Sequence, residues 1–309
     1  MVKVEKRKGM ALKRETGDKL FSLALLMPAV ITTVLFIVIP ILDSFYRSLL
    51  DFKIKNIISG TAGTWNSFQN YIKIFQSGKL LQAVWVNLVF VAAVVTLQFV
   101  ISMTLALILN QKIRGSRFFR SVMMIPWVVP TVISGLVWMW IYQPQYGLLK
   151  YLVSLFSGGR ITDFAILNDQ NTALIGVIIA ALWKQIPLGA LLLLAGLSNV
   201  PSDMQEAASI DGANYWQKLT KIIIPSMMSV IKITLTMSII ENFKQFPLVW
   251  TMTGGGPNGS TTTLGVLSYR EAFVSNNLGS GAAVTTMWMA LMIIVVFLFN
   301  KAVRTERQV

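Results

Sequence analysis

Six long apolar runs limit what this chain can fold into. Each run is long enough for a helix that crosses about 30 Å of hydrocarbon, which takes about 20 residues. We place them at Leu20–Leu42, Val84–Leu109, Phe118–Tyr142, Thr172–Leu197, Ser226–Val249 and Gly281–Val303. The first run is longer than the apolar core of a signal peptide and no small-residue cleavage site follows it, so we expect it to be retained. The sequence predicts an all-α integral membrane protein with six transmembrane helices.

Composition narrows the chemistry that such a protein could perform. Of the 309 residues, 54% are hydrophobic and 13% are charged, and there is no cysteine or histidine. These absences exclude disulfides, Cys/His metal sites, thiol nucleophiles and histidine bases, so we expect a protein that is not an enzyme, with no catalytic residue and no metal ligand. No phosphate-binding G-x-x-x-x-G-K-[ST] stretch occurs, and the glycine-rich Gly254–Gly259 lacks a lysine. We therefore expect no cofactor in this chain, and energy for uphill work would come from a partner or a coupled ion.

The positive charges indicate how the chain is oriented. The net charge is +14, which in so apolar a chain favours anchoring at the cytoplasmic face over nucleic-acid binding. Twice as many lysines and arginines lie on the side of the two termini as on the opposite side. We predict a basic cytoplasmic tail (1–19), one membrane domain (20–303) and a short cytoplasmic tail (304–309). The segments Leu49–Lys79 and Gly254–Ser280 are then external.

The loop between the fourth and fifth runs, residues 199–225, has the signals of two short helices. Ser202 and Gln205 form an S-x-x-Q capping pattern that predicts the start of the first helix. Gly212 can take the left-handed conformation that ends it, and Asn214 can cap a second helix over Tyr215–Ile224, before Pro225. The first helix presents Glu206, Ala207, Ala208 and Asp211; the alanines let another backbone approach closely, and the acids suit an arginine on a facing protein. The alternative is an amphipathic linker lying among the lipid headgroups.

The spacing within this loop resembles a known motif. Glu206-Ala207-Ala208, three residues, Gly212, nine residues and then Ile222-x-Ile224-Pro225 are similar to the "EAA" loop of bacterial ABC-importer permeases, with Ile224 where leucine is usual. The resemblance implies the type I ABC-importer permease fold and a coupling helix that sits in a groove of a separate ATPase, where ATP-Mg is bound. It implies that coupling to that ATPase involves Glu206, Ala207, Ala208, Asp211 and Gly212.

A second resemblance concerns the solute. The segment Phe246–Thr262 (FPLVWTMTGGGPNGSTT), with Tyr269, Ala272-Phe273 and Gly279–Ala283, is similar to the first of two unlike subunits in maltose- and glycerol-phosphate-type sugar permeases. The likeness extends from about Asn87 onward. It implies a bacterial cytoplasmic-membrane location and import of a sugar. The implied partners are a second, unlike permease subunit, an ATPase dimer and an extracytoplasmic solute-binding protein.

Polar residues within the fourth and fifth runs are candidates for a solute pathway, because such groups are costly in lipid and usually face an interior. The candidates are Lys184, Gln185, Glu241, Asn242, Lys244, Gln245, Phe246 and Trp250. Amides and charges beside aromatic faces suit sugar hydroxyls and ring C–H groups. Alternatively, Glu241 and Lys244 form a structural ion pair that never touches solute. We expect Pro187 to kink the fourth helix and Lys232 to reach toward the cytoplasmic headgroups.

Other functions remain open. An ABC permease for glycerol phosphate, an amino acid or a peptide is the nearest, and a basic cavity would favour the phosphate ester. An ion-coupled secondary carrier is a further alternative, but it often has inverted repeats and matched broken helices, and the sequence shows neither. A membrane anchor would leave Lys184 and Glu241 without a purpose.

Overall fold

The structure is a computed structural model that describes residues 21, 23–111, 114–160 and 164–303. Four of its helices are long and apolar enough to cross a membrane: Leu23–Ser48, α5 (Lys79–Asn110), α10 (Ala173–Ser198) and α17 (Leu278–Ala302). Two bent helix pairs pass the same test when each pair is taken as one span. The expected all-α class is confirmed. Both predicted tails, 1–19 and 304–309, lie outside the described residues.

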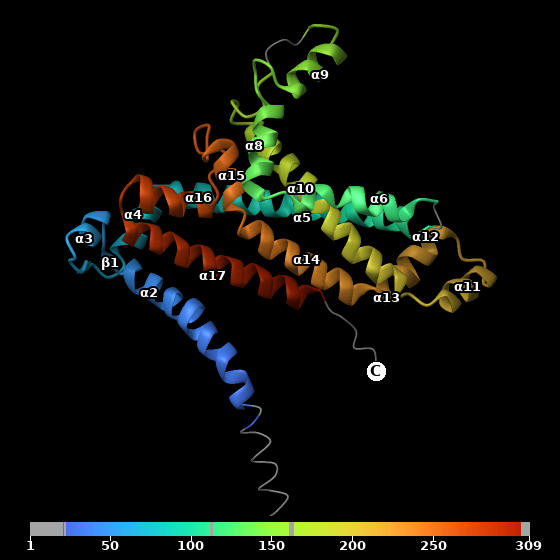
Figure 1. Ribbon diagram of the computed structural model, residues 1–309, viewed down its shortest axis with the longest axis horizontal. Helices are drawn as coiled ribbons and strands as arrows, with labels where there is room; N and C mark the ends of the chain where they lie inside the picture. The colour runs from blue at the N-terminus through green and yellow to red at the C-terminus, as the bar shows by residue number, and fades with distance from the viewer. Residues whose placement is uncertain (1–20, 22, 112–113, 161–163, 304–309) are drawn as a thin grey trace, which may run out of the picture.

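Helices α5, α10, α14 (Met228–Phe243) and α17 lie side by side in the body of the molecule (Figure 1). Their core is made of large apolar side chains such as Phe90, Val94 and Val177, which are fully buried. Helices α5 and α10 approach closely at Gly189, where a Cβ would lie only 2.7 Å from the Ser102 hydroxyl oxygen. Small residues of this kind let helix backbones come together where lipid offers no hydrophobic driving force.

Replacing Gly189 with alanine is expected to destabilise the bundle by about 1–3 kcal/mol, because the new methyl group overlaps Ser102 on α5. Thermal unfolding of the detergent-solubilised protein measures the loss. The variant Gly189→Ala/Ser102→Gly, which reopens the space, should recover much of it. Equal unfolding temperatures for Gly189→Ala and the parent would show that this contact is not tight.

The third predicted run, 118–142, is not one straight helix, and it is long and apolar enough to cross a membrane only when its two bent halves are taken together as one span. It consists of α6 (Ser116–Met123), α7 (Ile125–Val128) and α8 (Thr131–Ile141), with a 93° bend between Ser116–Val128 and Thr131–Ile141. The bend falls at Pro130, where Val129 is extended (φ −61°, ψ 130°). Proline lacks the amide hydrogen that would continue the helix and pushes the residue before it out of the helical region.

The fifth predicted run, 226–249, also differs. Helix α14 ends at Phe243, and α15 (Phe246–Thr253) begins after a break at Lys244 and Gln245, with Pro247 in its first turn. At its other end α14 meets the preceding helix, Tyr215–Ser226, at an angle of 72°. Proline is well placed in a first helical turn, where its missing hydrogen is not needed. The fifth span therefore consists of a bent entry, α14 and a separate short helix.

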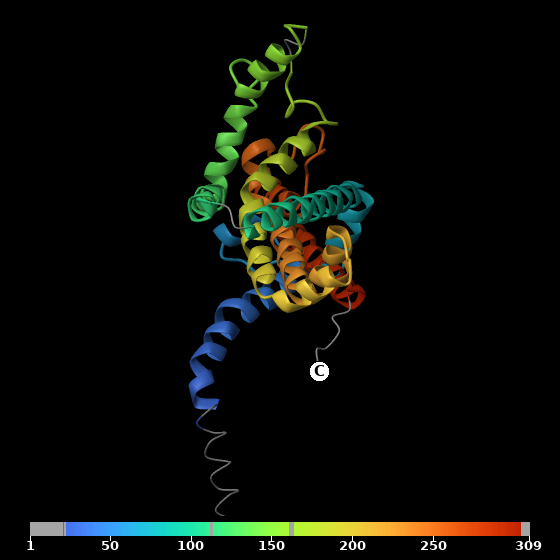
Figure 2. The same ribbon diagram turned by 90° about the vertical axis from the view of Figure 1, so that its right-hand side faces the viewer.

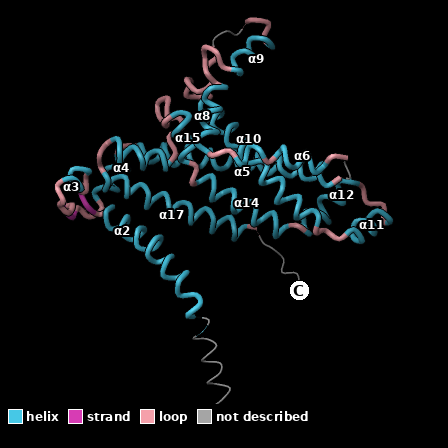
Figure 3. The backbone as a smooth tube through the Cα atoms, viewed as in Figure 1, coloured by secondary structure: helices cyan, strands magenta, loops and turns pink. Residues whose placement is uncertain are grey.

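Two groups of connecting segments lie at opposite ends of the body (Figures 1 and 3). One end carries an antiparallel pair of strands, β1 (Leu50–Asp51) and β2 (Thr64–Trp65), the only sheet among the described residues. The helices at that end are α3 (Ile54–Ile58), α4 (Gln69–Gln76), α16 (Leu264–Tyr269) and the π-helical turn η3 (Arg270–Val274). The other end carries α11 (Ser202–Ile210), α12 (Tyr215–Lys218), the π-helical turn η2 (Leu219–Ile223) and α13 (Ile224–Ser226). The segment Leu49–Lys79, expected to be external, and the segment 199–225, expected to be cytoplasmic, are thus far apart.

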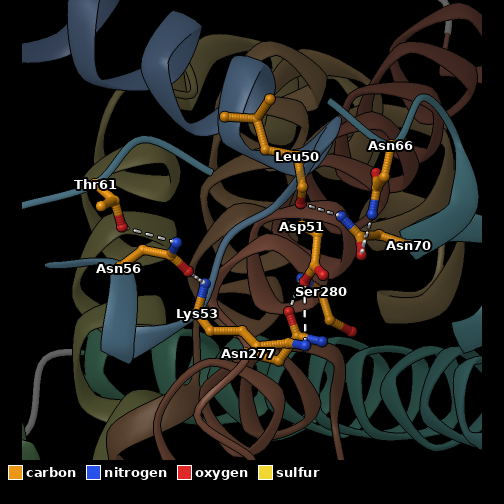
Figure 4. Close-up of polar contacts among 9 residues, drawn as sticks. All are labelled: Leu50, Asp51, Lys53, Asn56, Thr61, Asn66, Asn70, Asn277 and Ser280. Atoms are coloured by element: carbon orange, nitrogen blue, oxygen red, sulfur yellow. Dashed lines mark hydrogen bonds and ion pairs between the residues drawn. The ribbon is translucent and has the colours of Figure 1, made fainter. Parts of the chain in front are cut away.

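Side-chain amides secure the end that carries β1 (Figure 4). The buried Asn70 donates hydrogen bonds of 2.8 Å to the carbonyls of Ser48 and Leu50, so that α4 holds the chain where it leaves the first span. Asn277 accepts from the Ser280 amide (3.1 Å) and caps the start of α17. The Gly279 amide donates to the Phe52 carbonyl (2.8 Å), which joins the end of the first span to the start of the last.

Two parts of the chain extend away from the body on opposite sides (Figure 2). One is the helix Leu23–Ser48, which includes the π-helical turn η1 (Val34–Val38) and α2 (Ile39–Ser48). The other is α8 followed by α9 (Leu148–Phe156). Both carry exposed apolar side chains, including Phe36 and Phe156. This is what helices in contact with lipid or with another membrane subunit require.

Candidate functional site

A cavity of about 370 Å³ lies beside the bend of the third span. Its walls come from five elements: α5, the α7–α8 bend, α10, α14 and the break before α15. The lining residues are Gln98, Trp127, Thr131, Lys184, Gln185, Leu188, Gly189, Leu192, Thr234, Met237, Ser238, Glu241 and Gln245. Four of the eight residues expected to form a pathway line it: Lys184, Gln185, Glu241 and Gln245. The volume suits a small solute with several hydrogen-bonding groups.

A chain of polar contacts crosses the wall of this cavity. The Gln185 and Asn242 side-chain amides bond each other in both directions, at 3.0 and 2.9 Å. Asn242 also donates to the Ser238 carbonyl, and the Ser238 hydroxyl donates to Gln98 at 2.5 Å. Gln98 in turn donates to the Gln185 carbonyl at 3.2 Å. The contacts join α5, α10 and α14, so these polar groups within apolar helices are satisfied by one another.

The remaining candidates lie elsewhere. Asn242 is buried behind Gln185. Lys244 forms the expected ion pair with Glu241 (2.9 Å), and both side chains are more than half exposed. Phe246 and Trp250 stack on each other at 5.9 Å and contact Tyr269 of α16. The cavity lining, as drawn from the described residues, does not include Lys244, Phe246 or Trp250. The role of all eight residues in a solute pathway stays a prediction.

Two lysines within the spans bond to backbone carbonyls at helix ends. The Lys184 ammonium donates to the Trp127 carbonyl (3.2 Å) and to the Val129 carbonyl at the bend of the third span. Lys232, expected to reach toward headgroups, donates instead to the Asn300 carbonyl (3.0 Å) near the end of α17. Pro187 lies inside α10, which continues through it as one helix. A cation near a helix C-terminus is favourable because the last carbonyls carry partial negative charge.

The segment 199–225 forms two helical parts that meet at Gly212. This glycine has φ +77°, the left-handed conformation expected of it, and Ala213 donates back to the Ala208 carbonyl (2.9 Å). Asn214 caps the second part through a reciprocal pair of bonds with Gln217. The helix does not stop before Pro225 as expected but runs on to Ser226, with a π-helical turn at η2.

The capping pattern expected at Ser202 is wrong. Pro201 occupies the position before the helix, and Ser202 is already its first residue. The Ser202 hydroxyl bonds to Asp203 (3.3 Å) rather than to a backbone amide. Proline favours the start of a helix, and here Pro201 takes the capping position, so Ser202 is one position too late to cap the helix.

The side chains of this segment face outward. Glu206, Ala207, Asp211 and Gly212 are exposed, and Ala208 is half-buried. Large apolar side chains beside them are exposed too, with Ile210 at 87% and Trp216 at 70% of full exposure. An exposed patch that mixes apolar side chains with acids at the end of a membrane protein is typical of a protein-binding surface.

Several cavity residues were not predicted from the sequence. Gln98 on α5 and Thr131 at the bend were not proposed, and neither were Thr234 and Ser238 on α14. Gln98 carried a usable signal, because an amide inside an apolar span is unusual and needs a partner. Small hydroxyl residues carry a weaker signal, since they can bond to their own helix backbone.

Comparison with known proteins agrees with this architecture. Residues 98–306, about two thirds of the chain, match the family described as "binding-protein-dependent transport system inner membrane component". The chain is 28% identical to the trehalose/maltose transport system permease protein MalF of Thermococcus litoralis over 283 residues, covering 92% of this chain and 93% of that protein. It is 30% identical to the trehalose transport system permease protein SugA of Mycobacterium tuberculosis over 305 residues, covering 97% and 95%.

Two further comparisons complete the assignment. The chain is 30% identical to the sn-glycerol-3-phosphate transport system permease protein UgpA of Agrobacterium fabrum over 277 residues, covering 89% of this chain and 92% of that protein. A chain from the crystal structure of a bacterial ABC transporter involved in alginate import matches with a TM-score of 0.79 and 18% identity, covering 96% of this chain and 99% of that chain. At that identity the likeness shows the fold, which is the type I permease fold. The chain belongs to the family of inner-membrane components of binding-protein-dependent transport systems.

Proposed function

We propose that this chain is a permease subunit of an ATP-driven importer that moves a sugar or oligosaccharide across the bacterial cytoplasmic membrane. The family supplies the transport role. The observation that carries the coupling is the exposed two-helix segment 199–225 at one end of the bundle, with Glu206, Ala207 and Asp211 facing outward. A separate ATPase, which binds ATP-Mg, docks there. Both termini share that cytoplasmic face.

The segment is suited to receiving mechanical work. Its two helical parts are joined at Gly212 by a backbone bond and by a side-chain bond from Lys218 to Ser209 (3.2 Å), so they are tied together at the bend. The second part leads directly into α14, whose Thr234, Ser238 and Glu241 line the cavity. A push on α11 therefore reaches the cavity through one continuous piece of chain.

Two features support a sugar as the solute. Relatives of the chain are named for transport of trehalose and maltose. The cavity combines amides and hydroxyls with one lysine and one glutamate, which suits a neutral molecule rich in hydroxyl groups. Glycerol phosphate is the second candidate, because a relative is named for it. A phosphate would call for a basic cavity, and Glu241 opposes that.

The partners follow from the same proposal. A second, unlike permease subunit completes the pathway, against the apolar surfaces that this chain leaves exposed. An ATPase dimer binds at the segment 199–225 and an extracytoplasmic solute-binding protein docks at the opposite end. The sequence showed no broken helices, which argued against an ion-coupled carrier. The bends in the third and fifth spans remove that argument. Family membership and the exposed segment favour the ATP-driven importer.

Glu206→Lys is expected to uncouple the importer, because it places a positive charge where an arginine of the ATPase would bind. We expect the ATPase activity stimulated by solute-loaded binding protein to fall about tenfold, the loss of one charged hydrogen bond, while membrane insertion is unchanged. Asp51→Lys makes the same charge change at the opposite end; because the binding protein docks there, this control is scored by co-purification of the ATPase with the complex, which it should leave unchanged while Glu206→Lys lowers it. Full stimulation in Glu206→Lys would contradict the proposed role of this segment.

A further inference from the structure

The bend of the third span leaves backbone carbonyls that need partners. Helix α7 ends at Val128, Val129 is extended and Pro130 precedes α8, so the chain turns by 93° within a few residues. The last carbonyls of a helix have no donors within it. In an apolar environment a carbonyl without a hydrogen bond costs free energy, so a bend at this depth has to be satisfied from elsewhere.

Lys184 supplies that partner from another helix. It lies on α10, and its ammonium donates to the Trp127 carbonyl (3.2 Å) and to the Val129 carbonyl. These carbonyls lie on either side of Val128, the last residue of α7. A lysine ammonium has three donors, so most of its hydrogen-bonding capacity is directed to the bend. Its charge also complements the negative end of the helix dipole.

The two halves of the bent span are attached to different parts of the molecule. On α6, the Arg120 guanidinium donates to the Leu109 carbonyl (3.2 Å) near the end of α5. On α8, Gly135 lies so close to α15 that a Cβ there would be 3.0 Å from the Thr251 Cβ. Any movement of α15 relative to the end of α5 therefore acts on the bend, where the Lys184 contacts lie.

The bend also forms one wall of the cavity. Trp127 lies before it and Thr131 after it, and both line the cavity together with Lys184. Glu241 and Gln245 also line the cavity, from the end of α14 and the break before α15. The width of the cavity consequently depends on the angle between α7 and α8.

We infer that Lys184 is a positioning residue that holds the bend of the third span, and with it this wall of the cavity, through its bonds to the Trp127 and Val129 carbonyls. Its ammonium serves the backbone of the protein rather than the solute. The inference rests on the proposed function only in taking the cavity as part of the solute pathway. The geometry of the bend is testable without solute or ATP.

Distances between spin labels on either side of the bend test whether Lys184 holds its angle. The chain has no cysteine, so a pair can be introduced at Phe119 on α6 and Trp140 on α8, both of which are exposed. We expect a narrow distance distribution in the assembled complex with Lys184 present. Lys184→Met, which keeps the apolar stem but cannot donate, should broaden and shift it, and Lys184→Arg should largely restore it. Lys232→Met, which removes a similar ammonium–carbonyl contact at the end of α17, should leave it unchanged.

A transport readout separates a positioning role from solute binding. We expect Lys184→Met to lower the ATPase activity stimulated by solute-loaded binding protein about tenfold, in step with the broadened distances. If Lys184→Met does not assemble, Lys184→Gln, which keeps one donor group, should give an intermediate distribution. An unchanged distribution in Lys184→Met would overturn the inference, whether or not activity falls. A broadened distribution with full activity would support the hold of Lys184 on the bend and contradict the proposed part of this cavity in the solute pathway.

Discussion

Replacing Gly212 with valine is expected to uncouple transport from ATP hydrolysis. Gly212 has φ +77°, and nothing lies within 4 Å of the place where a Cβ would be, so the effect arises from the backbone and not from a clash. An L-residue in the left-handed region costs about 1–2 kcal/mol, and a β-branched side chain is especially unfavourable there. We expect the bend between α11 and α12 to open and the ATPase activity stimulated by loaded binding protein to fall about tenfold.

Gly212→Asn is the matched control, because asparagine tolerates the left-handed conformation better than other residues with a side chain. It should keep most of the stimulated activity although it adds a side chain at the same exposed position. Equal activity in the valine and asparagine variants would mean that the left-handed turn is not needed. Equal loss in both would mean that the ATPase contacts the glycine surface itself.

Gln185→Leu is expected to lower stability strongly and to abolish transport. Asn242 is 1% exposed, and the Gln185 side chain donates to its amide oxygen at 3.0 Å. Leucine would leave that buried oxygen without its donor, at a cost of about 1–3 kcal/mol. Thermal unfolding of the detergent-solubilised protein measures the loss of stability, and uptake of solute into vesicles measures the loss of transport.

A second substitution and a control make this result specific. Gln185→Leu/Asn242→Leu removes both amides, so no oxygen is stranded, and it should be more stable than Gln185→Leu alone while remaining inactive. Gln245→Leu is the same change at another cavity residue, whose side chain has no hydrogen-bond partner among the residues described, and it should change stability little. If the double variant unfolds at a temperature no higher than Gln185→Leu alone, the stranded Asn242 oxygen is not the cause of the lost stability.

Much of the fold is predictable from the sequence because lipid imposes a simple rule. An unbroken apolar run predicts a spanning helix, and α5, α10 and α17 agree with their predicted runs to within a few residues. The rule fails at Pro130 and at Lys244–Gln245, because hydropathy averaged over a whole run does not register a break of two residues. Proline was a signal for the first break, but proline inside a spanning helix is common, and α10 continues through Pro187.

The candidate site was predictable in its residue types but not in its pairings. Local signals worked where the partners are close in sequence, as in the left-handed Gly212, the Asn214 cap and the Glu241–Lys244 ion pair. They could not show that Gln185 bonds to Asn242 or that Lys184 bonds to the bend, because those contacts depend on how distant helices are placed. Phe246 and Trp250 were expected beside the polar groups by sequence proximity. The break before α15 turns them toward Tyr269 instead.

Uptake into proteoliposomes can show whether the segment 199–225 receives work from an ATP-hydrolysing partner. The complex of this chain with its second permease subunit and ATPase would be reconstituted, with loaded binding protein outside and ATP inside. We predict that solute accumulates only when ATP and the ATPase are both present, and that Glu206→Lys prevents accumulation. Uphill accumulation by this chain alone, driven by an ion gradient, would mean that the segment 199–225 does not couple transport to ATP hydrolysis.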